Sequence, residues 1–261
     1  MESYKNIILE EKAGVAVLIL NNPESRNPLT EDTKTEMLEA LVHVAQTDEF
    51  RALVITGKGP AFCAGGDVKK IGQELTSEEK RQVMQKSQQL LRQLINLGTP
   101  VIAAVNGDAF GMGCNLALAA DFIIASDKAR FSEVFVKLGI IPDFGALYFL
   151  PRLIGLAKSK ELAFLGKVIN AEEAEKIGLI YKVVPNEELE MEAMTFAGRL
   201  AGMPTKAIGR AKEMLNRAFN MTLDEVLEEE IKAQLVLSET EDHREGIRAL
   251  MEKRKPKFQG K

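Results

Sequence analysis

Short apolar runs alternate with longer amphipathic stretches along the first part of the chain. Ile7 to Leu9 and Val15 to Leu20 are apolar runs separated by Ala13-Gly14, and this pattern predicts a β-hairpin. Asp32 to Thr47 follows with apolar residues at helical spacing, and Arg51 to Thr56 is again an apolar run of strand length. We therefore expect a helix and then a buried strand.

The middle of the chain repeats this arrangement. A helix is predicted to begin at Ser77 and to end at Gly98-Thr99-Pro100, because acidic residues occupy its first turn and Gly and Pro close it. Val101 to Val105 and Phe122 to Ala125 have the pattern of buried strands. The recurring unit is a strand, a Gly turn and a helix, so we predict an α/β fold built as a spiral of strand-strand-helix turns.

The strand pattern stops after about Ala193. Four successive helices are expected there, over Glu188 to Leu200, Pro204 to Phe219, Leu223 to Leu237 and Asp242 to Arg254. We divide the chain into a core, residues 1–192, and a helical part, residues 193–261. The helical part is too apolar on one side to stand free, so it packs on other copies of the chain or closes the core of its own monomer.

Two turns rich in small residues carry the strongest chemical signal. Ala61 to Asp67 and Asn106 to Gly113 each follow an apolar run and precede a helical pattern. The first N–H groups of a helix lack intrahelical partners and lie at the positive end of its dipole. Such turns suit a phosphate, or the negative oxygen that develops on a thioester carbonyl. The simpler alternative is a pair of turns in which only Gly fits.

Several familiar motifs are missing from the sequence. It contains no G-x-x-x-x-G-K-[ST] and no G-x-G-x-x-G after a strand, so neither an NTPase loop nor a dinucleotide site is supported. It also lacks a G-x-S-x-G element, which removes the nucleophile position of a serine hydrolase.

Composition is that of a soluble enzyme with a sizeable core. The chain has 261 residues, 46% hydrophobic and 28% charged, and a net charge of -4, which argues against a nucleic-acid partner. Cys63 and Cys114 lack metal-site spacing, and His43 and His243 lie in charged helical stretches. We therefore expect reduced core thiols, no metal site and no His-based triad. Without a secretory pattern or a membrane-spanning run, we expect a cytoplasmic protein with no membrane partner.

The glycine turns and their surroundings resemble a known family. Ala61 to Asp67, Pro100 to Gly107 and Gly111 to Asp121 resemble the signature of the crotonase (enoyl-CoA hydratase/isomerase) superfamily, and the resemblance spans roughly Tyr4 to Phe258. It implies the crotonase spiral of ββα units, a C-terminal helical oligomerisation region and a homotrimer or dimer of trimers. The implied substrate is an acyl-CoA thioester. Coenzyme A is part of that substrate, and no separate cofactor is implied.

The resemblance also implies roles for residues of the two turns. In the family, two peptide N–H groups hold the thioester oxygen, and the matching residues here are Gly66 and Met112. The neighbouring substrate-binding positions of the first turn are Cys63, Ala64, Gly65 and Asp67. Met112 stands where Gly is common in hydratases. Because only its N–H is used, the role survives, while the side chain narrows the pocket.

The acid residues depart from the hydratase pattern. Hydratases of the family activate water with two Glu residues, and the matching positions here are Asn115 and Phe135. Neither accepts a proton, so water addition by that route is not supported. The loop Ile140 to Gly145 instead resembles the Pro-Asp-x-Gly loop of the isomerases, which implies Asp143 as the base. Together with Leu150 to Leu153 it most resembles the epoxyphenylacetyl-CoA isomerase branch, from which Ala146 departs.

Asp143 has an alternative role, as the cap of a helix that begins near Gly145. Against it, we expect apolar neighbours to remove water from the carboxyl and raise its pKa; these neighbours are Phe135, Phe144, Leu147 and Phe149. Glu133 ranks below Asp143, because on a helix over Ser132 to Lys137 its side chain would point partly away from Phe135. Asp67 is expected to cap a helix over Val68 to Ile71, and Asp121 to make a structural hydrogen bond.

Two basic residues are candidate contacts for coenzyme A. Arg26 matches a loop whose backbone and basic side chain meet coenzyme A in relatives, and a plain surface arginine is the alternative. Lys253 opens a basic run, Lys253 to Lys257, whose alternative is a solvated tail. The resemblance favours contact with coenzyme A phosphates, often those of a neighbouring subunit.

These residues predict an acyl-CoA isomerase. Asp143 would take a proton from C2 of a 3-enoyl-CoA, the N–H groups of Gly66 and Met112 would hold the dienolate, and Asp143 would return the proton at C4 to give the 2-enoyl-CoA. The alternatives are isomerisation of a ring-1,2-epoxyphenylacetyl-CoA, 2-enoyl-CoA hydration with Glu133, and a non-catalytic scaffold that binds acyl-CoA.

Overall fold

Two β-sheets form the centre of the chain. The computed structural model describes residues 4–67 and 74–261. The first sheet has six strands in the order β1-β2-β3-β5-β7-β10, namely β1 (Ile7–Lys12), β2 (Val15–Leu20), β3 (Ala52–Gly57), β5 (Val101–Val105), β7 (Phe122–Ser126) and β10 (Lys182–Val184). The second has four strands in the order β4-β6-β8-β9, namely β4 (Ala61–Cys63), β6 (Asp108–Phe110), β8 (Arg130–Ser132) and β9 (Val168–Asn170).

The chain winds between these sheets as a spiral. Each of the pairs β3-β4, β5-β6 and β7-β8 gives its first strand to the six-stranded sheet and its second to the four-stranded sheet. Within the sheets, β3, β5 and β7 are parallel neighbours, and so are β4, β6 and β8. The predicted α/β spiral is confirmed. It brings the carboxyl ends of β4, β6 and β8 to one edge.

The inner strands β2, β3 and β5 of the first sheet are buried on both faces. In β2, the side chains of Val15 and Val17 pack in the cluster under helix α7 (Leu189–Ala201). Ala16 and Leu18 point to the opposite face and join the main core. Alternate residues thus enter two cores, which explains why the strand is an unbroken apolar run. The predicted hairpin is also confirmed, since β1 and β2 pair antiparallel.

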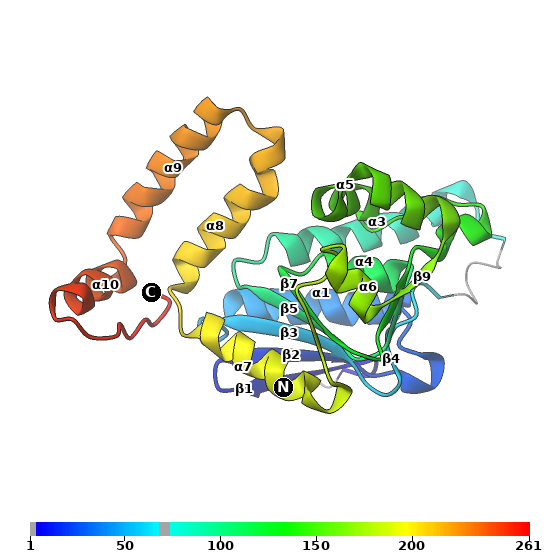
Figure 1. Cartoon of the computed structure of the whole chain (residues 1–261), viewed down its shortest axis with the longest axis horizontal. Helices are drawn as coiled ribbons and strands as arrows, with labels where there is room; N and C mark the ends of the chain where they lie inside the picture. Colours follow the sequence, from blue (N-terminus) through cyan, green and yellow to red (C-terminus); the bar gives the residue numbers. More distant parts are fainter. Residues whose placement is uncertain (1–3, 68–73) are drawn as a thin grey trace.

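Helices cover both faces of the first sheet (Figure 1). The predicted helix at Ser77 is α3 (Ser77–Ile95), which begins with a capping box of Thr76 and Glu79. Among the described residues, the other α-helices of this part are α1 (Glu31–Gln46), α4 (Met112–Leu118), α5 (Ala146–Leu165) and α6 (Ala171–Lys176). Helix α7 packs on the sheet through Ala193 and Ala197. The boundary placed between residues 192 and 193 therefore falls inside a helix of the core, and the division into two parts stays a prediction.

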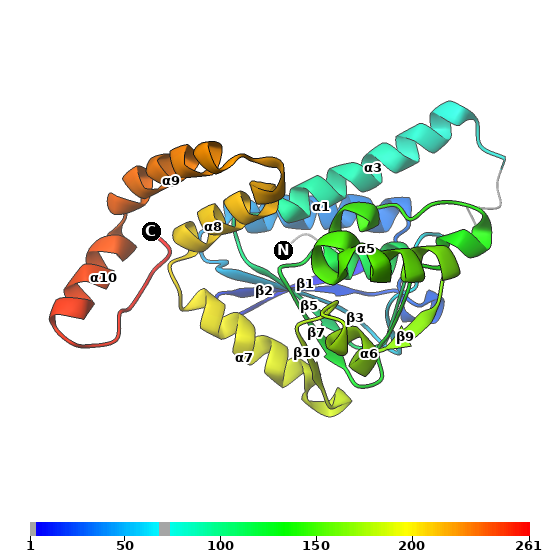
Figure 2. The same ribbon diagram turned by 45° about the horizontal axis from the view of Figure 1, so that its top comes forward.

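The last three helices extend away from the sheets as an arm (Figures 1 and 2). We call α8 (Thr205–Arg217), α9 (Leu223–Ser238) and α10 (Glu241–Met251) the helical arm. Lys212 of α8 holds the arm to the core, because its Nζ lies 2.8 Å from Oδ2 of Asp121. The same oxygen accepts the N–H of Val101 at 2.7 Å, so the structural hydrogen bond expected of Asp121 is confirmed.

The chain returns from the arm to the core. Arg51 donates from Nη1 to the main-chain oxygen of Phe258 at 2.8 Å and from Nη2 to that of Met203 at 2.7 Å. Asp242 accepts the N–H groups of Gln259 and Gly260. The tail is therefore fixed at both the core and α10.

Candidate active site

The two glycine turns lie side by side, as the sequence predicts. Strands β4 and β6 are parallel neighbours, with Ala61 opposite Asp108. Gly65, which follows β4, has φ +106°, and a Cβ there would lie 2.8 Å from the Phe110 oxygen and 3.6 Å from the Met112 nitrogen. A Cβ on Gly113 would collide with the oxygen of Cys63. Only glycine allows this approach, so the turns are built to meet.

The two predicted N–H donors lie at these turns. Met112 is the first residue of α4, with Gly111 as its N-cap at φ 53°, so its N–H has no partner within the helix. At Gly66, a Cβ would meet no atom within 4 Å among the described residues. Open space therefore adjoins Gly66 while its neighbours in the turn are packed. The role of the two N–H groups in holding a thioester stays a prediction.

The first turn is held from behind by the loop that contains Arg26. Ala64 donates its N–H to the oxygen of Arg26 at 2.9 Å, and Leu29 donates to the oxygen of Gly65 at 2.8 Å. Asn27, 1% exposed, donates from Nδ2 to the oxygens of Lys58 and Ala61. Sequence reasoning missed Asn27, although a buried amide in a loop is a usual sign of such bracing. The Arg26 side chain is exposed and lies 3.4 Å from Asp108.

The two cysteines of this region are structural, and the surroundings of Asp67 are only partly described. Burial raises the pKa of Cys63 to about 12, so this thiol is not a nucleophile at neutral pH. Cys63 and Cys114 are both buried and free. Asp67 ends the first described segment, and the helix expected over Val68 to Ile71 lies outside the described residues.

Asp143 lies in a tightly turned loop next to α4. The next residues, Phe144 and Gly145, both have positive φ, 46° and 80°. Asn115 of α4 donates from Nδ2 to the main-chain oxygen of Asp143 at 3.0 Å. Helix α5 has Gly145 as its N-cap and no side-chain cap bond, so the capping alternative for Asp143 is wrong. Its main-chain oxygen, not its carboxyl, accepts the N–H of Ala146.

The carboxyl of Asp143 is shielded from water much as predicted. Burial raises its pKa to about 6, and the positive charge of buried Lys34 acts against this rise. Phe135 and Phe144 are buried, but Leu147 is 53% exposed, so its predicted part in the shielding is wrong for this chain. Lys34 was missed, although it falls three and four residues before Met37 and Leu38 on the apolar face of α1.

Glu133 lies closer to this site than the sequence suggested. Ser132 is the last residue of β8, and the following 3₁₀ helix begins only at Val134. Glu133 is therefore not helical, and it directly follows β8 as Gly111, the residue before Met112, directly follows β6. Its side chain is 1% exposed. No local sequence pattern marks this position, because β8 has only three residues and two of them are polar.

Four side-chain oxygens around Asn115 are buried and have no hydrogen-bond partner among the described residues; they are Asn115 Oδ1, Glu133 Oε1, Glu133 Oε2 and Asp143 Oδ1. Burial raises the pKa of Glu133 to about 7. The close side chains of Cys114 and Asn115 oppose this rise, and the charge of Asp143 adds to it. Unpaired buried oxygens are costly, so their concentration marks a place where a ligand binds or protons move.

Of the remaining predicted residues, Phe135 lies at the site and Lys253 lies in the part of the chain that forms the arm. The ring of Phe135 packs on the second turn, since a Cβ on Gly111 would lie 3.5 Å from its Cζ. Lys253 follows α10, the last helix of the arm, and α10 lies far from α4 and α5 (Figures 1 and 2). The contact of Lys253 with coenzyme A of a neighbouring subunit stays a prediction.

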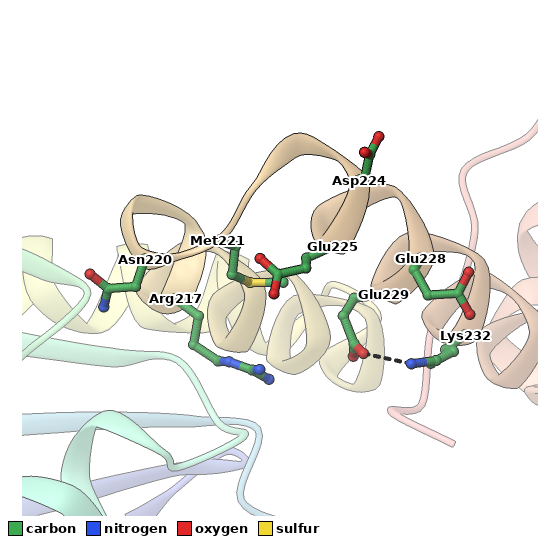
Figure 3. A pocket seen from close by; sticks show the side chains of 8 residues that line it. All are labelled: Arg217, Asn220, Met221, Asp224, Glu225, Glu228, Glu229 and Lys232. Carbon is green, nitrogen blue, oxygen red and sulfur yellow. Dashed lines mark hydrogen bonds and ion pairs between the residues drawn. The ribbon is translucent and has the colours of Figure 1, made fainter.

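A surface hollow of about 630 Å³ lies elsewhere, on the arm (Figure 3). Half of its lining residues are acidic, among them Glu225, Glu228 and Glu229. Lys232 pairs with Glu229 at 2.8 Å along α9 on one side of the hollow (Figure 3). None of the residues of the two turns or of the Asp143 loop lines this hollow. Among residues 4–67 and 74–261, no His, Cys, Asp and Glu group could hold a metal ion, and no helix is long and apolar enough to cross a membrane.

Comparison with known proteins agrees with this arrangement. Residues 10–261 match the family model described as enoyl-CoA hydratase/isomerase, and the chain belongs to that family. It is 39% identical to 1,2-epoxyphenylacetyl-CoA isomerase of Escherichia coli over 98% of both chains. It is 40% identical to crotonyl-CoA hydratase of Syntrophomonas wolfei, again over 98% of both.

Solved structures give the same fold. Enoyl-CoA hydratase from Bacillus anthracis superposes with a TM-score of 0.93 at 34% identity, covering 98% of this chain and 100% of that one. The fold is therefore the crotonase fold, and the family supports an enzyme that acts on acyl-CoA. Because the similar proteins carry both isomerase and hydratase names, the reaction has to be argued from the residues of this chain.

Proposed function

We propose that the protein is an acyl-CoA isomerase that converts a 3-enoyl-CoA into the 2-enoyl-CoA. The observation that carries the proposal is Asp143, a half-buried residue with a pKa of about 6 and a buried Oδ1 that has no hydrogen-bond partner among the described residues. A base with a pKa near working pH removes protons effectively. Asn115 ties the Asp143 loop to the helix that begins with Met112.

The reaction follows from these positions. The thioester oxygen binds to the N–H groups of Gly66 and Met112, which stabilise the negative charge that forms there. Asp143 then removes a proton from C2, and the electron pair delocalises into a dienolate. A proton added at C4 leaves the double bond between C2 and C3. The proposal includes a cytoplasmic location and a trimer or dimer of trimers.

Turnover of 3-hexenoyl-CoA tests the proposal, because the conjugated product absorbs where the substrate does not. Asp143→Asn keeps the side-chain size but cannot accept the proton, so the rate should fall by about 100-fold to 10000-fold. Acyl-CoA affinity and melting temperature should hardly change. Asp127→Asn is the matched control, since Asp127 accepts the N–H of Asn186 outside the site. An undiminished rate in Asp143→Asn would exclude Asp143 as the base.

A second candidate is the isomerisation of ring-1,2-epoxyphenylacetyl-CoA, favoured by the name of the relative at 39% identity. The same N–H groups and the same base would serve it. Product analysis with both substrates separates the two candidates. Loss of conjugated absorbance from 2-hexenoyl-CoA in water would instead indicate hydration. Binding without any turnover would indicate a non-catalytic scaffold.

A further inference from the structure

Glu133 lies where it can supply a third functional group to the proposed active site. The turns after β4 and β6 supply Gly66 and Met112, and Glu133 directly follows β8, the parallel neighbour of β6. In sheets of parallel strands, ligands bind beyond the carboxyl ends. The protein thus places a buried acid at the third of three adjacent strand ends.

Glu133 is a buried carboxyl with weak polar contacts, because the nearby side chains of Cys114 and Asn115 favour its charged form without forming well-shaped hydrogen bonds to it. It is 1% exposed, and neither of its oxygens has a hydrogen-bond partner among the described residues. A structural buried acid is normally paired or bonded. Asp121 is an example of such a structural acid, because its Oδ2 accepts hydrogen bonds from Lys212 Nζ and from the N–H of Val101.

The acyl chain of a bound thioester would pass this group. Asn115 lies three residues after Met112 in α4, so both are on one face of the helix. The Asn115 amide is hydrogen-bonded to the Asp143 main chain and lies close to the Glu133 carboxyl. A chain whose carbonyl oxygen is held at Met112 therefore meets both acids as it runs along this face.

We infer that Glu133 is the acid that protonates C4 and that it shares one proton with Asp143 between turnovers. This inference rests on the isomerase function proposed above. Asp143, as a carboxylate, takes the C2 proton, and the C–H electron pair enters the dienolate. The O–H bond of neutral Glu133 breaks as the C4–H bond forms and the C2–C3 double bond appears. The proton on Asp143 then passes to the Glu133 carboxylate, directly or through water, and restores the starting state.

The charges around Asp143 and Glu133 support Asp143 as the base and Glu133 as the acid. Lys34 favours the charged form of Asp143, whereas Asp143 favours the neutral form of Glu133. Cys114 of α4 faces Glu133 as a thiol, since burial, followed by the nearby Glu133 charge, raises its pKa well above the ordinary value. Like charges in one buried site hold a proton between them. The base and the acid are thereby present together near neutral pH.

The source of the C4 hydrogen tests the inference. With 3-hexenoyl-CoA doubly deuterated at C2 and the enzyme in excess, so that each enzyme molecule turns over only once, a base that returns its own proton carries deuterium to C4, whereas Glu133 delivers the solvent proton that it already holds. We expect the wild type to place mostly solvent hydrogen there. In Glu133→Gln, the rate should fall by about 100-fold to 10000-fold, and a larger share of C4 should carry deuterium because Asp143 alone remains. Equal deuterium at C4 in both proteins, or an unchanged rate, would overturn the inference.

Control variants separate chemistry from folding. Glu36→Gln makes the same change at an acid that binds main-chain N–H groups of β1 and the residues before it, and it should keep rate and label distribution. Glu133→Asp should restore part of the rate lost in Glu133→Gln. Activity of the wild type should decline where Glu133 loses its proton, and Glu133→Gln should lack this alkaline decline. An alkaline decline that persists in Glu133→Gln would contradict the assignment.

A wild type that binds 3-hexenoyl-CoA without turning it over would end the isomerase proposal itself. The proton-sharing pair is then judged separately by carboxyl ¹³C NMR titration of the wild type and Asp143→Asn. Removing the Asp143 charge should lower the pKa of Glu133. An unchanged pKa would show that the two carboxyls do not share a proton.

Discussion

Asn115 and Asp143 are joined by a hydrogen bond of 3.0 Å from the amide Nδ2 of one to the main-chain oxygen of the other. The bond spans α4 and the loop before α5, and it fixes the loop that carries the proposed base. Position 115 is where the hydratases of the family resemblance carry an acid. In this chain the residue holds the loop of the proposed base, and its amide has no group that accepts a proton.

Replacing Asn115 by Leu should therefore lower turnover without abolishing substrate binding. A hydrogen bond of this kind contributes about 1 kcal/mol, so a rate reduced by roughly 5-fold is expected. Steady-state kinetics with 3-hexenoyl-CoA measures it. The matched control is Asn216→Leu, which removes a similar amide-to-main-chain bond to Ile95 at the base of the arm. Equal rates in Asn115→Leu and the wild type would mean that the loop holds its shape unaided.

The N–H of Met112 can be removed almost alone. Proline is tolerated at the first position of a helix, so Met112→Pro should fold while deleting one donor to the thioester oxygen. Loss of one such donor lowers turnover by about 100-fold to 1000-fold. Ser77→Pro makes the same change at the first residue of α3 and should leave the rate intact.

Binding gives a separate measure of the same turns. An acyl-CoA at about 100 times its Kd should raise the free energy of unfolding by about 2.7 kcal/mol, and Met112→Pro should reduce this gain. ATP and NAD should give no comparable shift, because the chain lacks their motifs. Equal shifts with ATP and with acyl-CoA would indicate a general phosphate site.

Much of this architecture could be predicted from local sequence patterns. The hairpin of β1 and β2, the capped start of α3 and the glycine turns at Gly65 and Gly113 all follow from nearby residues. In each case the cause is local, such as a strand period, a capping box or a backbone approach that only glycine permits.

The predictions that were wrong or incomplete concern residues whose surroundings depend on contacts between distant segments. Glu133 could not be ranked correctly because a three-residue strand, β8, precedes it, and its identity as a strand depends on pairing with β6. The charge of Lys34 reaches Asp143 from a helix more than a hundred residues earlier. Likewise, the exposure of Leu147 depends on how α5 packs. The hydrophobic periodicity of α5 does not predict this packing.

The helical arm should bury its apolar side in an oligomer. Leu223, Leu227, Ile231 and Leu235 repeat every fourth residue along α9 and are all exposed in the single chain. Large exposed apolar stripes usually mark protein interfaces. Sedimentation velocity at micromolar concentration should therefore show a trimer or a hexamer.

Charged residues on this stripe should weaken the assembly. Leu227→Glu with Ile231→Glu would place carboxylates in the expected interface and shift the mass toward the monomer. Asp224→Asn and Glu228→Gln, on the hollowed side of the same helix, should leave it unchanged. A wild type that sediments as a clean monomer would show that the stripe stays exposed to solvent.

The two buried acids should make the chain less stable as pH rises. The folded pKa of Glu133, about 7, lies above its ordinary value of 4.5, so between these values the folded state binds more protons than the unfolded state. The free energy of unfolding must then fall with rising pH, by on the order of 3 kcal/mol for Glu133 if its pKa shift is fully expressed. Asp143 acts in the same direction between 3.8 and about 6.

Urea unfolding from pH 4.5 to 8 at one protein concentration measures this effect. The double variant Glu133→Gln with Asp143→Asn lacks both titrations, so its stability relative to the wild type should increase steadily as pH rises. All other groups are common to the two proteins and cancel in the comparison. A difference that stays constant across this range would show that both carboxyls titrate in the folded chain as they do in the unfolded one.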